Sequence, residues 1–599
     1  MYKLNEKQLE AVNHFKGNML VLAGPGSGKT TIITNRVKFL LEKGVSEKNI
    51  LVITFTKSAA KEMAIRFENI YGANKVLFGT FHSVFFRILR RHLNYTLANI
   101  LKEGEKISII KKIIADKFNF DSDDDLVISI ANEISLLKNE LLDINFYSSN
   151  SCGMDDFKKI FTEYEQCKRS QNKIDFDDML VNCYKLLSQN QNIASYYKSL
   201  YKFILIDEFQ DINRVQYECV KLFSTGNLFA VGDDDQSIYK FRGSSPDFIL
   251  NFSNEFANTK IITLDKNYRS TQNIISFCNK VISQNKNRYE KNIMGVGEIG
   301  APVQMLRFKN ITDESIKISQ MIKQNPDRLN DTAVIFRTNL QAQAFITNFM
   351  NMNIPYKLKD EILSLYDHWA AKDILAYLKF CLDDTDNQSL LKIINHPKRY
   401  VSKTMIVKAA KKSYNILGNL LADKSLPTWR KTPIEELLFH MDQLALQKPY
   451  QAIKYIRKMI GYDNYISEFA KNQNVKSKWL FEILDELQES ARNFTSLEDF
   501  ICYSENFSGN IKSSDDGVTL TTMHSAKGLE FDTVFLISTV EGLIPHEKSK
   551  TDAELEEELR LLYVGLSRAK NNLFVSTIEN RYEAPAKISR FLSFATDGN

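Results

Sequence analysis

Near its N-terminus the chain reads Met19-Leu20-Val21-Leu22-Ala23-Gly24-Pro25-Gly26-Ser27-Gly28-Lys29-Thr30, an apolar run followed by a glycine-rich segment ending in Gly-Lys-Thr. This order of strand, glycine-rich turn and Lys-Thr is typical of a phosphate-binding P-loop. Glycines let backbone N–H groups converge on an anion, because a Cβ atom would crowd the phosphates. Residues 31–41 then space apolar side chains along one face of a helix, whose N-terminus would favour the same anion. The stretch predicts an α/β fold that binds a nucleoside triphosphate.

Each residue of the P-loop pattern has an expected role. Lys29 would reach the β- and γ-phosphates, and the hydroxyl of Thr30 would lie on Mg²⁺. The residues expected to contact the nucleotide are Ala23, Gly24, Pro25, Gly26, Ser27, Gly28, Lys29, Thr30 and Thr31. The predicted cofactors are therefore ATP and Mg²⁺.

The composition limits the class of protein. At 599 residues the chain is too long for one core, and its length suggests about four domains or subdomains. The net charge of +5 fits a polyanion partner and an ordinary surface about equally well. The seven cysteines have no paired spacing, so neither a disulfide framework nor a metal–thiolate site is expected. With no apolar stretch long enough to cross a bilayer, we expect a soluble, cytoplasmic enzyme without a membrane partner.

Short apolar runs separated by amphipathic stretches extend over two parts of the chain, as in parallel α/β sheets. The runs are residues 19–22, 50–55, 76–81, 203–206, 228–231, 261–264, 333–336, 518–521, 533–537 and 573–575. Residues from about 85 to 172 and from about 380 to 512 change instead to helical periodicity. The pattern predicts two α/β cores, each interrupted by a mostly helical insertion.

An acidic pair follows one of the predicted strands. Asp207 and Glu208 come directly after the apolar run 203–206. In a chain with a P-loop, an acid at the carboxyl end of a buried strand is where the Mg²⁺-holding Walker B carboxylate belongs. Asp207 would hold the metal, and Glu208 would orient and deprotonate the attacking water. Without Lys29, surface charge would be the better interpretation of such a pair.

Two arginines are candidates for contact with the γ-phosphate. Arg269 follows the run 261–264, and Arg568 lies in the segment 563–570 near the C-terminus. Phosphoryl transfer spreads negative charge over the equatorial oxygens, where a positioned guanidinium increases the rate roughly a thousandfold or more. Spacing alone does not separate either arginine from an ordinary surface residue.

Several blocks in a fixed order resemble the superfamily 1 helicases of the UvrD/Rep/PcrA type. The blocks are Leu4-Asn5-Glu6-Lys7-Gln8, Gly79-Thr80-Phe81-His82-Ser83, Ile174-Asp175-Phe176-Asp177-Asp178, residues 231–243 (VGDDDQSIYKFRG), residues 522–531 (TMHSAKGLEF) and Ser567-Arg568-Ala569. Together with the P-loop they cover nearly the whole chain. The resemblance implies an ATP hydrolase and DNA helicase that moves 3′ to 5′ on single-stranded DNA.

The resemblance also implies roles in nucleotide binding. Gln8 matches the glutamine that reads adenine, Tyr268 the tyrosine that stacks on the base, and Glu530 the glutamate near the ribose. Gln236 matches the γ-phosphate sensor, while Arg36 matches a further nucleotide-contacting arginine. The set implied to be catalytic is Lys29, Asp207, Glu208, Gln236, Arg269 and Arg568. Because these residues belong to two sheets, the nucleotide would lie in a cleft whose closure moves one core against the other.

For the strand being moved, the physics requires aromatic platforms and a basic track. Phe81, Tyr239 and Phe241 resemble the family's base-stacking positions. The nearby residues implied as polar contacts are His82, Arg242 and His524. For any single aromatic, packing in the core is the alternative interpretation. At Phe241 the family usually carries tryptophan, which offers a larger stacking surface.

The resemblance divides the chain into two RecA-like cores and two helical insertions. The first core comprises 1–86 and 173–278, with an insertion at 87–172. The second core comprises 279–380 and 513–599, with an insertion at 381–512. The expected fold class is thus α/β, with parallel sheets flanked by helices.

The chain departs from the family pattern in the second insertion. Residues 395–402 read NHPKRYVS where relatives carry Pro-x-Arg-Gly-Ile-Gly, so the glycines whose backbone would approach duplex DNA are missing. We therefore keep three hypotheses open. The first is an ATP-driven translocase that unwinds single-stranded and partly duplex DNA by itself. The second is a DNA-stimulated motor that needs a nuclease or another repair or anti-phage defence subunit. The third is a nucleotide switch that does not translocate.

Overall fold

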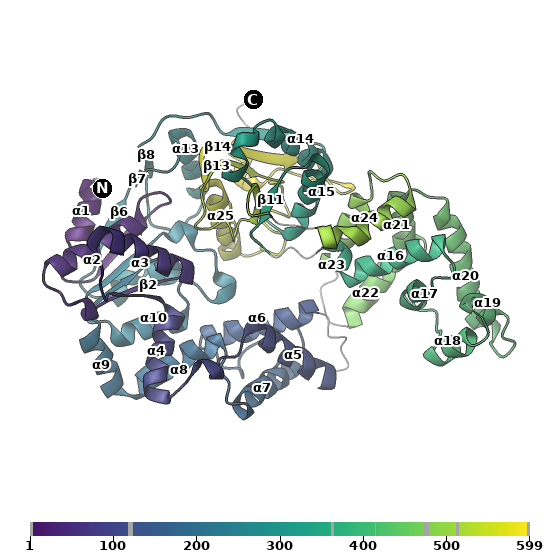
Figure 1. Ribbon diagram of the computed structural model, residues 1–599, viewed down its shortest axis with the longest axis horizontal. Helices are drawn as coiled ribbons and strands as arrows, with labels where there is room; N and C mark the ends of the chain where they lie inside the picture. The colour runs from purple at the N-terminus through teal and green to yellow at the C-terminus, as the bar shows by residue number, and fades with distance from the viewer. Residues whose placement is uncertain are drawn as a thin grey trace.

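Two parallel six-stranded sheets form the centre of the molecule, as the computed structural model shows (Figure 1). The structure describes residues 4–117, 124–360, 364–413, 415–472, 478–510 and 514–595. The first sheet has the order β3 (Leu77–Thr80), β2 (Ile50–Thr54), β4 (Phe203–Ile206), β5 (Leu228–Gly232), β1 (Met19–Ala23), β6 (Lys260–Leu264). The second has the order β11 (Tyr356–Leu358), β12 (Val518–Thr522), β10 (Thr332–Phe336), β13 (Phe531–Leu536), β14 (Ala569–Ile578), β9 (Gln304–Phe308). The predicted α/β class with two RecA-like cores is confirmed.

The four inner strands of the first sheet, β1, β2, β4 and β5, are buried on both faces, which explains their continuous apolar runs. Alternate residues of β1 point to opposite layers: Leu20 and Leu22 pack in one apolar cluster, and Met19 and Val21 in the other. The helices around this sheet are α1 (Glu6–Asn13), α2 (Lys29–Glu42), α3 (Lys57–Tyr71), α4 (Phe81–Leu93), α8 (Phe176–Gln189), α9 (Gln191–Leu200) and α10 (Arg214–Phe223). We call this sheet and its helices the first core.

The second sheet is covered in the same way. Its helices are α13 (Gln272–Ile282), α14 (Ile311–Lys323), α15 (Ala342–Met352) and α25 (Asp552–Leu566). We call this unit the second core. Every strand pairing in the two large sheets is parallel. The carboxyl ends of the strands, and the loops that follow them, therefore lie at one edge of each sheet.

Two groups of helices interrupt the cores. The first insertion contains α5 (Glu103–Lys117), α6 (Asp124–Asn139) and α7 (Met154–Ser170), which pack around an apolar cluster of their own. The second insertion follows α16 (Trp369–Leu382) and extends away from both sheets (Figure 1). Its helices are α17 (Asn387–Ile393), α18 (Lys403–Ala410), α19 (Ile416–Leu421), α20 (Thr428–Ala445), α21 (Pro449–Lys458), α22 (Tyr462–Asn472), α23 (Lys478–Ser490) and α24 (Leu497–Asn510).

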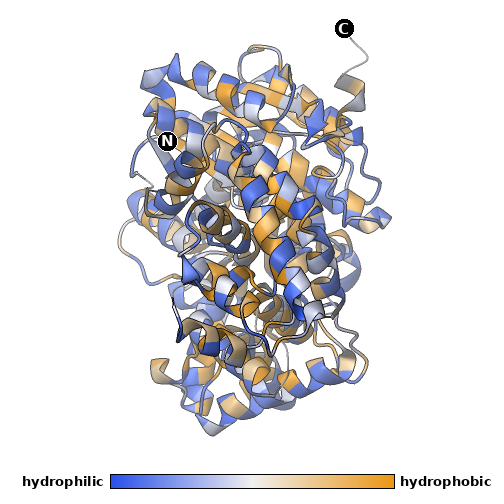
Figure 2. Cartoon of the chain, turned by 90° about the vertical axis from the view of Figure 1, so that its right-hand side faces the viewer, coloured by the Kyte–Doolittle hydropathy of each residue, from blue (hydrophilic) through white to orange (hydrophobic). Residues whose placement is uncertain are grey.

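The second insertion shares one continuous apolar cluster with the second core, through α16. Hydrophilic and hydrophobic residues are interspersed along the helices on this side of the molecule (Figure 2). Among the described residues, no helix has the length and apolar character that crossing a membrane requires.

Candidate nucleotide and nucleic-acid site

The P-loop connects β1 to α2 as its sequence predicts. Gly26 and Gly28 have φ angles of +66° and +90°, a conformation in which glycine avoids the steric penalty of other residues. A Cβ atom on Gly26 would lie 2.6 Å from the Cβ atom of Arg269. Asn267 ties the two segments together, since its Nδ2 donates to the carbonyl of Pro25 at 2.8 Å. The glycines therefore allow the P-loop to lie directly against the segment that carries Arg269.

A cavity of about 790 Å³ opens beside the P-loop, between the two cores. Side chains from both cores line it, which is the arrangement expected for a nucleotide held at their interface. The predicted residues that line it are Gly24, Pro25, Gly26, Ser27, Gly28, Lys29, Thr30, Thr31, Asp207, Glu208, Gln236, Tyr239, Tyr268, Arg269, Glu530 and Arg568. Ala23 is the last residue of β1, immediately before this lining.

The acidic pair lies at the carboxyl end of β4, close to the P-loop lysine. The Nζ atom of Lys29 lies 3.5 Å from a carboxylate oxygen of Glu208. Burial and the neighbouring Glu208 raise the pKa of Asp207 to about 7. Burial opposes the ionisation of Glu208 too, but Lys29 and Lys527 outweigh it and lower the pKa of Glu208 to about 2. Two adjacent carboxyl groups thus have very different affinities for a proton.

Gln236 and Arg568 meet across the interface of the cores. The Nη2 atom of Arg568 donates to Oε1 of Gln236 at 3.4 Å. The amide of Gln236 donates in turn to Asp233 at 2.7 Å. Arg568 is 2% exposed, and burial, with nearby Arg269, lowers its pKa to about 9. Arg568 donates its hydrogen bonds to uncharged oxygens, among them those of Val564 and Leu529, so its charge is available to an anion.

The second arginine, Arg269, pairs across the same interface. Its Nε atom lies 2.8 Å from Glu530, and the ammonium group of Lys570 lies 2.7 Å from the other oxygen of Glu530. Next to it, the ring of Tyr268 is 52% exposed, so one face remains available for stacking.

Gln8 contacts the P-loop from the helix α1. Its Nε2 atom donates to the carbonyl of Ser27 at 2.9 Å, and its Oε1 accepts the N–H of Asn5. The amide of Asn5 donates to the hydroxyl of Tyr268 at 2.8 Å. Gln8, Asn5 and Tyr268 thus form one hydrogen-bonded group beside the P-loop.

The structure does not place Arg36 in the cleft. Its side chain is 1% exposed, and it donates to the backbone carbonyls of Ala11, Val12 and His14 and packs over Phe229. These carbonyls lie at the C-terminal end of α1, where a cation is favourable. The expected nucleotide contact of Arg36 is corrected to a structural role: it fixes the helix that carries Gln8.

An aromatic and basic group lies where the two cores meet beside the cavity. Tyr239 and Phe241 of the first core contact each other at 5.9 Å between ring centroids, and Phe241 contacts His524 of the second core at 5.7 Å. The guanidinium of Arg242 lies 5.4 Å from the Phe241 ring and 5.5 Å from the Tyr239 ring. Phe241 is 53% exposed. Burial, and the field of Arg337, lower the pKa of His524 to about 4, so its ring is neutral near pH 7.

Two residues expected to contact DNA, Phe81 and His82, are buried or half-buried. Phe81 is 2% exposed and packs edge to face on Phe85 inside the first core, so the expected base-stacking role is corrected to core packing. His82, which follows it, is half-buried and contacts the ring of Phe176 at 5.9 Å.

Two residues of the site did not emerge from the sequence. Phe55 stacks parallel on Tyr239, with centroids 5.4 Å apart and an angle of 12° between the rings, and both line the cavity. Lys527 donates to Asp211 at 2.5 Å and to the carbonyl of Gln236 at 2.6 Å. Phe55 ends an apolar run, which predicts a place in the strand itself, whereas the sequence signal for Lys527 is its place in the block 522–531.

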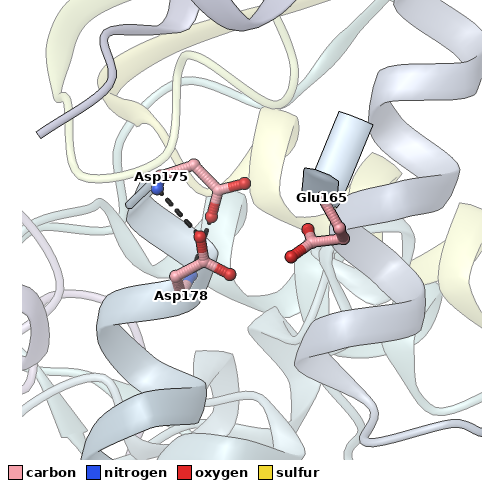
Figure 3. A group of neighbouring side chains, drawn as sticks. All are labelled: Glu165, Asp175 and Asp178. Carbon is pink, nitrogen blue, oxygen red and sulfur yellow. Dashed lines mark hydrogen bonds between the residues drawn. The ribbon is translucent and has the colours of Figure 1, made fainter. Parts of the chain in front are cut away.

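A separate cluster of carboxylates, Glu165, Asp175 and Asp178, lies at the base of the first insertion (Figure 3). The ammonium groups of Lys138 and Lys168 lie 2.5 to 3.0 Å from all three. Because two cations already occupy the space between the carboxylates, this cluster is an ion-pair network that joins α6 and α7 to α8.

The fold and the cleft define a P-loop protein in which two parallel α/β cores enclose one nucleotide-sized cavity. The family model for the UvrD/REP helicase N-terminal domain matches residues 4–257, and the model for the UvrD-like helicase C-terminal domain matches residues 262–580. The chain therefore belongs to the UvrD/Rep helicase family, whose members are ATP-binding and DNA-binding hydrolases.

Curated relatives match almost the whole chain. The protein YjcD of Bacillus subtilis is 33% identical, over 98% of this chain and 80% of its own length. The ATP-dependent DNA helicase PcrA of the same organism is 33% identical, over 96% of this chain and 83% of its own. The DNA helicase II of Rickettsia typhi is 32% identical, over 97% and 93%.

Proposed function

We propose that this protein is an ATP-driven translocase that moves 3′ to 5′ along single-stranded DNA and unwinds partly duplex DNA. The observation that carries the proposal is the contact between Gln236 and Arg568, because it joins the two cores at the nucleotide cavity. The aromatic group of Tyr239 and Phe241 follows Gln236 by only a few residues, so a change at the cavity has a short path to a bound strand. The direction is the one that the family resemblance implies.

The cavity residues fit a nucleoside triphosphate with Mg²⁺. The raised pKa of Asp207 reflects a buried carboxyl group that a divalent cation would stabilise in its charged form. Asp207 and Thr30 would hold the metal, and Lys29 with the P-loop amides would hold the phosphates. Bound Mg²⁺ and ATP supply the reactive γ-phosphoryl group and a neutralised leaving group.

Glu208 is paired with Lys29 and accepts a hydrogen bond from the amide of Gln210 at 2.6 Å. If Lys29 bound phosphate instead, Glu208 would lose the larger of the two positive charges that lower its pKa, and Lys527 would remain. Its basicity then rises, and it orients an attacking water and accepts its proton. Arg269 and Arg568 stabilise the charge that spreads over the γ-phosphate oxygens.

Replacement of Glu208 tests this mechanism. We expect Glu208→Gln to bind ATP and DNA but to hydrolyse ATP at least about a hundredfold more slowly, the range of general-base catalysis. The comparison is Lys29→Ala, in which nucleotide binding itself should be lost. Normal turnover of Glu208→Gln, measured by phosphate release with single-stranded DNA present, would show that another group is the base.

A partner-dependent motor of a repair or anti-phage defence complex is the second candidate. The observation that favours it is the loop 395–402, in which Tyr400 and Ser402 stand where the family carries glycines. Strand-separation assays with and without proteins of a host lysate distinguish the two candidates. A nucleotide switch without movement would show no DNA-stimulated hydrolysis.

A further inference from the structure

The distal part of the second insertion is strongly basic. Residues 391–431 contain ten Lys and Arg but one Asp, so this segment carries more positive charge than the net +5 of the whole chain. We call these residues the basic tip. They extend from the end of α17 to the start of α20, at the end of the molecule farthest from the two sheets (Figure 1).

Most of these cations face solvent. The exposed lysines that form no ion pair with another described residue are Lys392, Lys398, Lys403, Lys411, Lys412 and Lys424. Asp423, the one acid, is paired with Lys408 at 2.8 Å. Charge of one sign that is left uncompensated on a surface attracts a polyanion.

Two aromatic rings lie within this charged surface. Tyr400 and Trp429 contact each other edge to face, with centroids 6.0 Å apart. Their side chains are 54% and 57% exposed, unusually high values for such large rings. A cation accompanies each ring at 4.9 Å: Lys398 beside Tyr400 and Arg430 beside Trp429.

The loop beneath Tyr400 is tightly built. Arg399 is buried and donates to the carbonyls of Ile393 and Pro397 and to the hydroxyl of Tyr377. The amide of Asn395 bonds to both the N–H and the carbonyl of Val401.

Tyr400 itself has a φ angle of +58°, a conformation that favours glycine and costs energy in a tyrosine. The buried contacts of its neighbours hold it there, so the ring is directed outward by the fold.

We propose that the basic tip is a second nucleic-acid site, which takes unpaired nucleotides by stacking their bases on Tyr400 and Trp429. Exposed rings alone would suit a protein partner, but the six exposed lysines of the same segment, unpaired among the described residues, favour phosphates. A duplex offers phosphates and hides its base faces, whereas a single strand offers both. This inference rests on the proposed function and adds to it a place outside the cleft between the cores where unpaired bases are held.

Intrinsic fluorescence tests the stacking directly, because Trp429 is exposed while Trp369 and Trp479 are half-buried. A DNA fork with two unpaired tails should quench the tryptophan emission of the full chain, and Trp429→Phe should abolish the quenching while leaving an aromatic ring for binding. Equal quenching by a blunt duplex, or quenching that persists in Trp429→Phe, would overturn the proposal.

Affinity provides the second measurement. The double variant Tyr400→Asn/Trp429→Ala removes both rings. Asparagine is chosen at residue 400 because it tolerates the left-handed backbone there. We expect the affinity of this variant for the fork to fall at least about fivefold, the lower end for loss of base stacking. Its affinity for a blunt duplex should not change.

The matched control is Phe439→Ala, which removes an equally exposed ring (59%) from the same helix α20 but outside the basic tip. It should bind the fork like the unaltered chain. ATP hydrolysis stimulated by long single-stranded DNA should be normal in all variants. Absence of that stimulation in the unaltered chain would instead contradict the proposed function. A fork affinity that is unchanged in the double variant would exclude the tip as a site for unpaired bases.

Discussion

The ammonium group of Lys527 lies 2.5 Å from a carboxylate oxygen of Asp211, so a side chain of the second core reaches into the first. The same group donates to the backbone carbonyl of Gln236. Burial raises the pKa of Asp211 to about 6, although Lys527 acts in the opposite direction. One lysine thus links the end of β4 to the residue proposed to sense the γ-phosphate.

Removal of this lysine should affect turnover more than nucleotide binding. We expect Lys527→Met to lower the kcat of DNA-stimulated ATP hydrolysis about tenfold or more, since a buried charge-assisted hydrogen bond contributes about 1.5–3 kcal/mol. The KM for ATP should change less, because the P-loop is intact. Steady-state kinetics of Lys550→Met, an exposed lysine of the same core, provide the baseline. An unaltered kcat would mean that the contact between the cores is incidental to turnover.

The aromatic group beside the cavity should contribute to the grip on a single strand. Phe241→Ala should weaken the binding of single-stranded DNA by about 1–3 kcal/mol, the range for loss of one base–aromatic contact. Fluorescence anisotropy with a labelled oligonucleotide measures this loss. Phe81→Leu is the control: its ring is buried, so we expect lower stability with unchanged DNA affinity. If Phe81→Leu lowered the affinity for DNA and Phe241→Ala left it unchanged, Phe81 and not Phe241 would be the residue that stacks on a base.

The raised pKa of Asp207 predicts a pH-dependent effect of its removal. Its pKa is about 7 in the folded protein and about 3.9 in an unfolded chain, so the folded state binds the extra proton between these values. The carboxyl group therefore costs stability as the pH rises from about 4, and the cost is complete above pH 7. Asp207→Asn should stabilise the nucleotide-free protein by up to about 4 kcal/mol above pH 7, from about 1.4 kcal/mol per pKa unit.

Thermal melting without nucleotide or Mg²⁺, at pH 5 and at pH 8, measures this difference. The stabilisation by Asp207→Asn should be larger at pH 8. A larger stabilisation at pH 5 would contradict the assigned direction of the pKa shift.

A buried ion network supports the loop before Gln236. Lys291 is buried, and its ammonium group lies 2.5 to 2.9 Å from Asp233, Asp234 and Asp235. Burial opposes its charge, but the three carboxylates outweigh burial and raise its pKa. Lys291→Met would leave the carboxylates uncompensated, which typically costs about 3–5 kcal/mol.

We therefore expect a clear fall in the melting midpoint of Lys291→Met and almost none in Lys286→Met, an exposed lysine of the same segment. Equal midpoints for the two variants would show that the network adds nothing to stability.

The sequence predicted most of the two sheets, because strands buried on both faces read as unbroken apolar runs. All ten predicted runs form strands, including 518–521 and 573–575 near the C-terminus. The two strands of the second sheet that were not predicted, β9 and β11, lie at its edges. Both are partly exposed, so their residues do not form a continuous apolar run.

The nucleotide site was predicted better than the nucleic-acid contacts. Glycine-rich turns and acids after strands are local signals, whereas the exposure of an aromatic depends on tertiary packing. Phe55 and Phe81 illustrate this: each adjoins a predicted strand, yet one lines the cavity and the other is in the core. Arg36 likewise found its partners in the carbonyls of α1, a contact that no spacing reveals.

The position of β1 within the first sheet has a consequence for biosynthesis. Its two neighbours, β5 and β6, are made more than 200 residues after it. The strand that leads into the P-loop therefore leaves the ribosome long before either neighbour, and it has no partner in the sheet until β5, which ends at Gly232, has emerged. During that interval the nascent chain presents an apolar segment to its surroundings, a natural point of contact for chaperones.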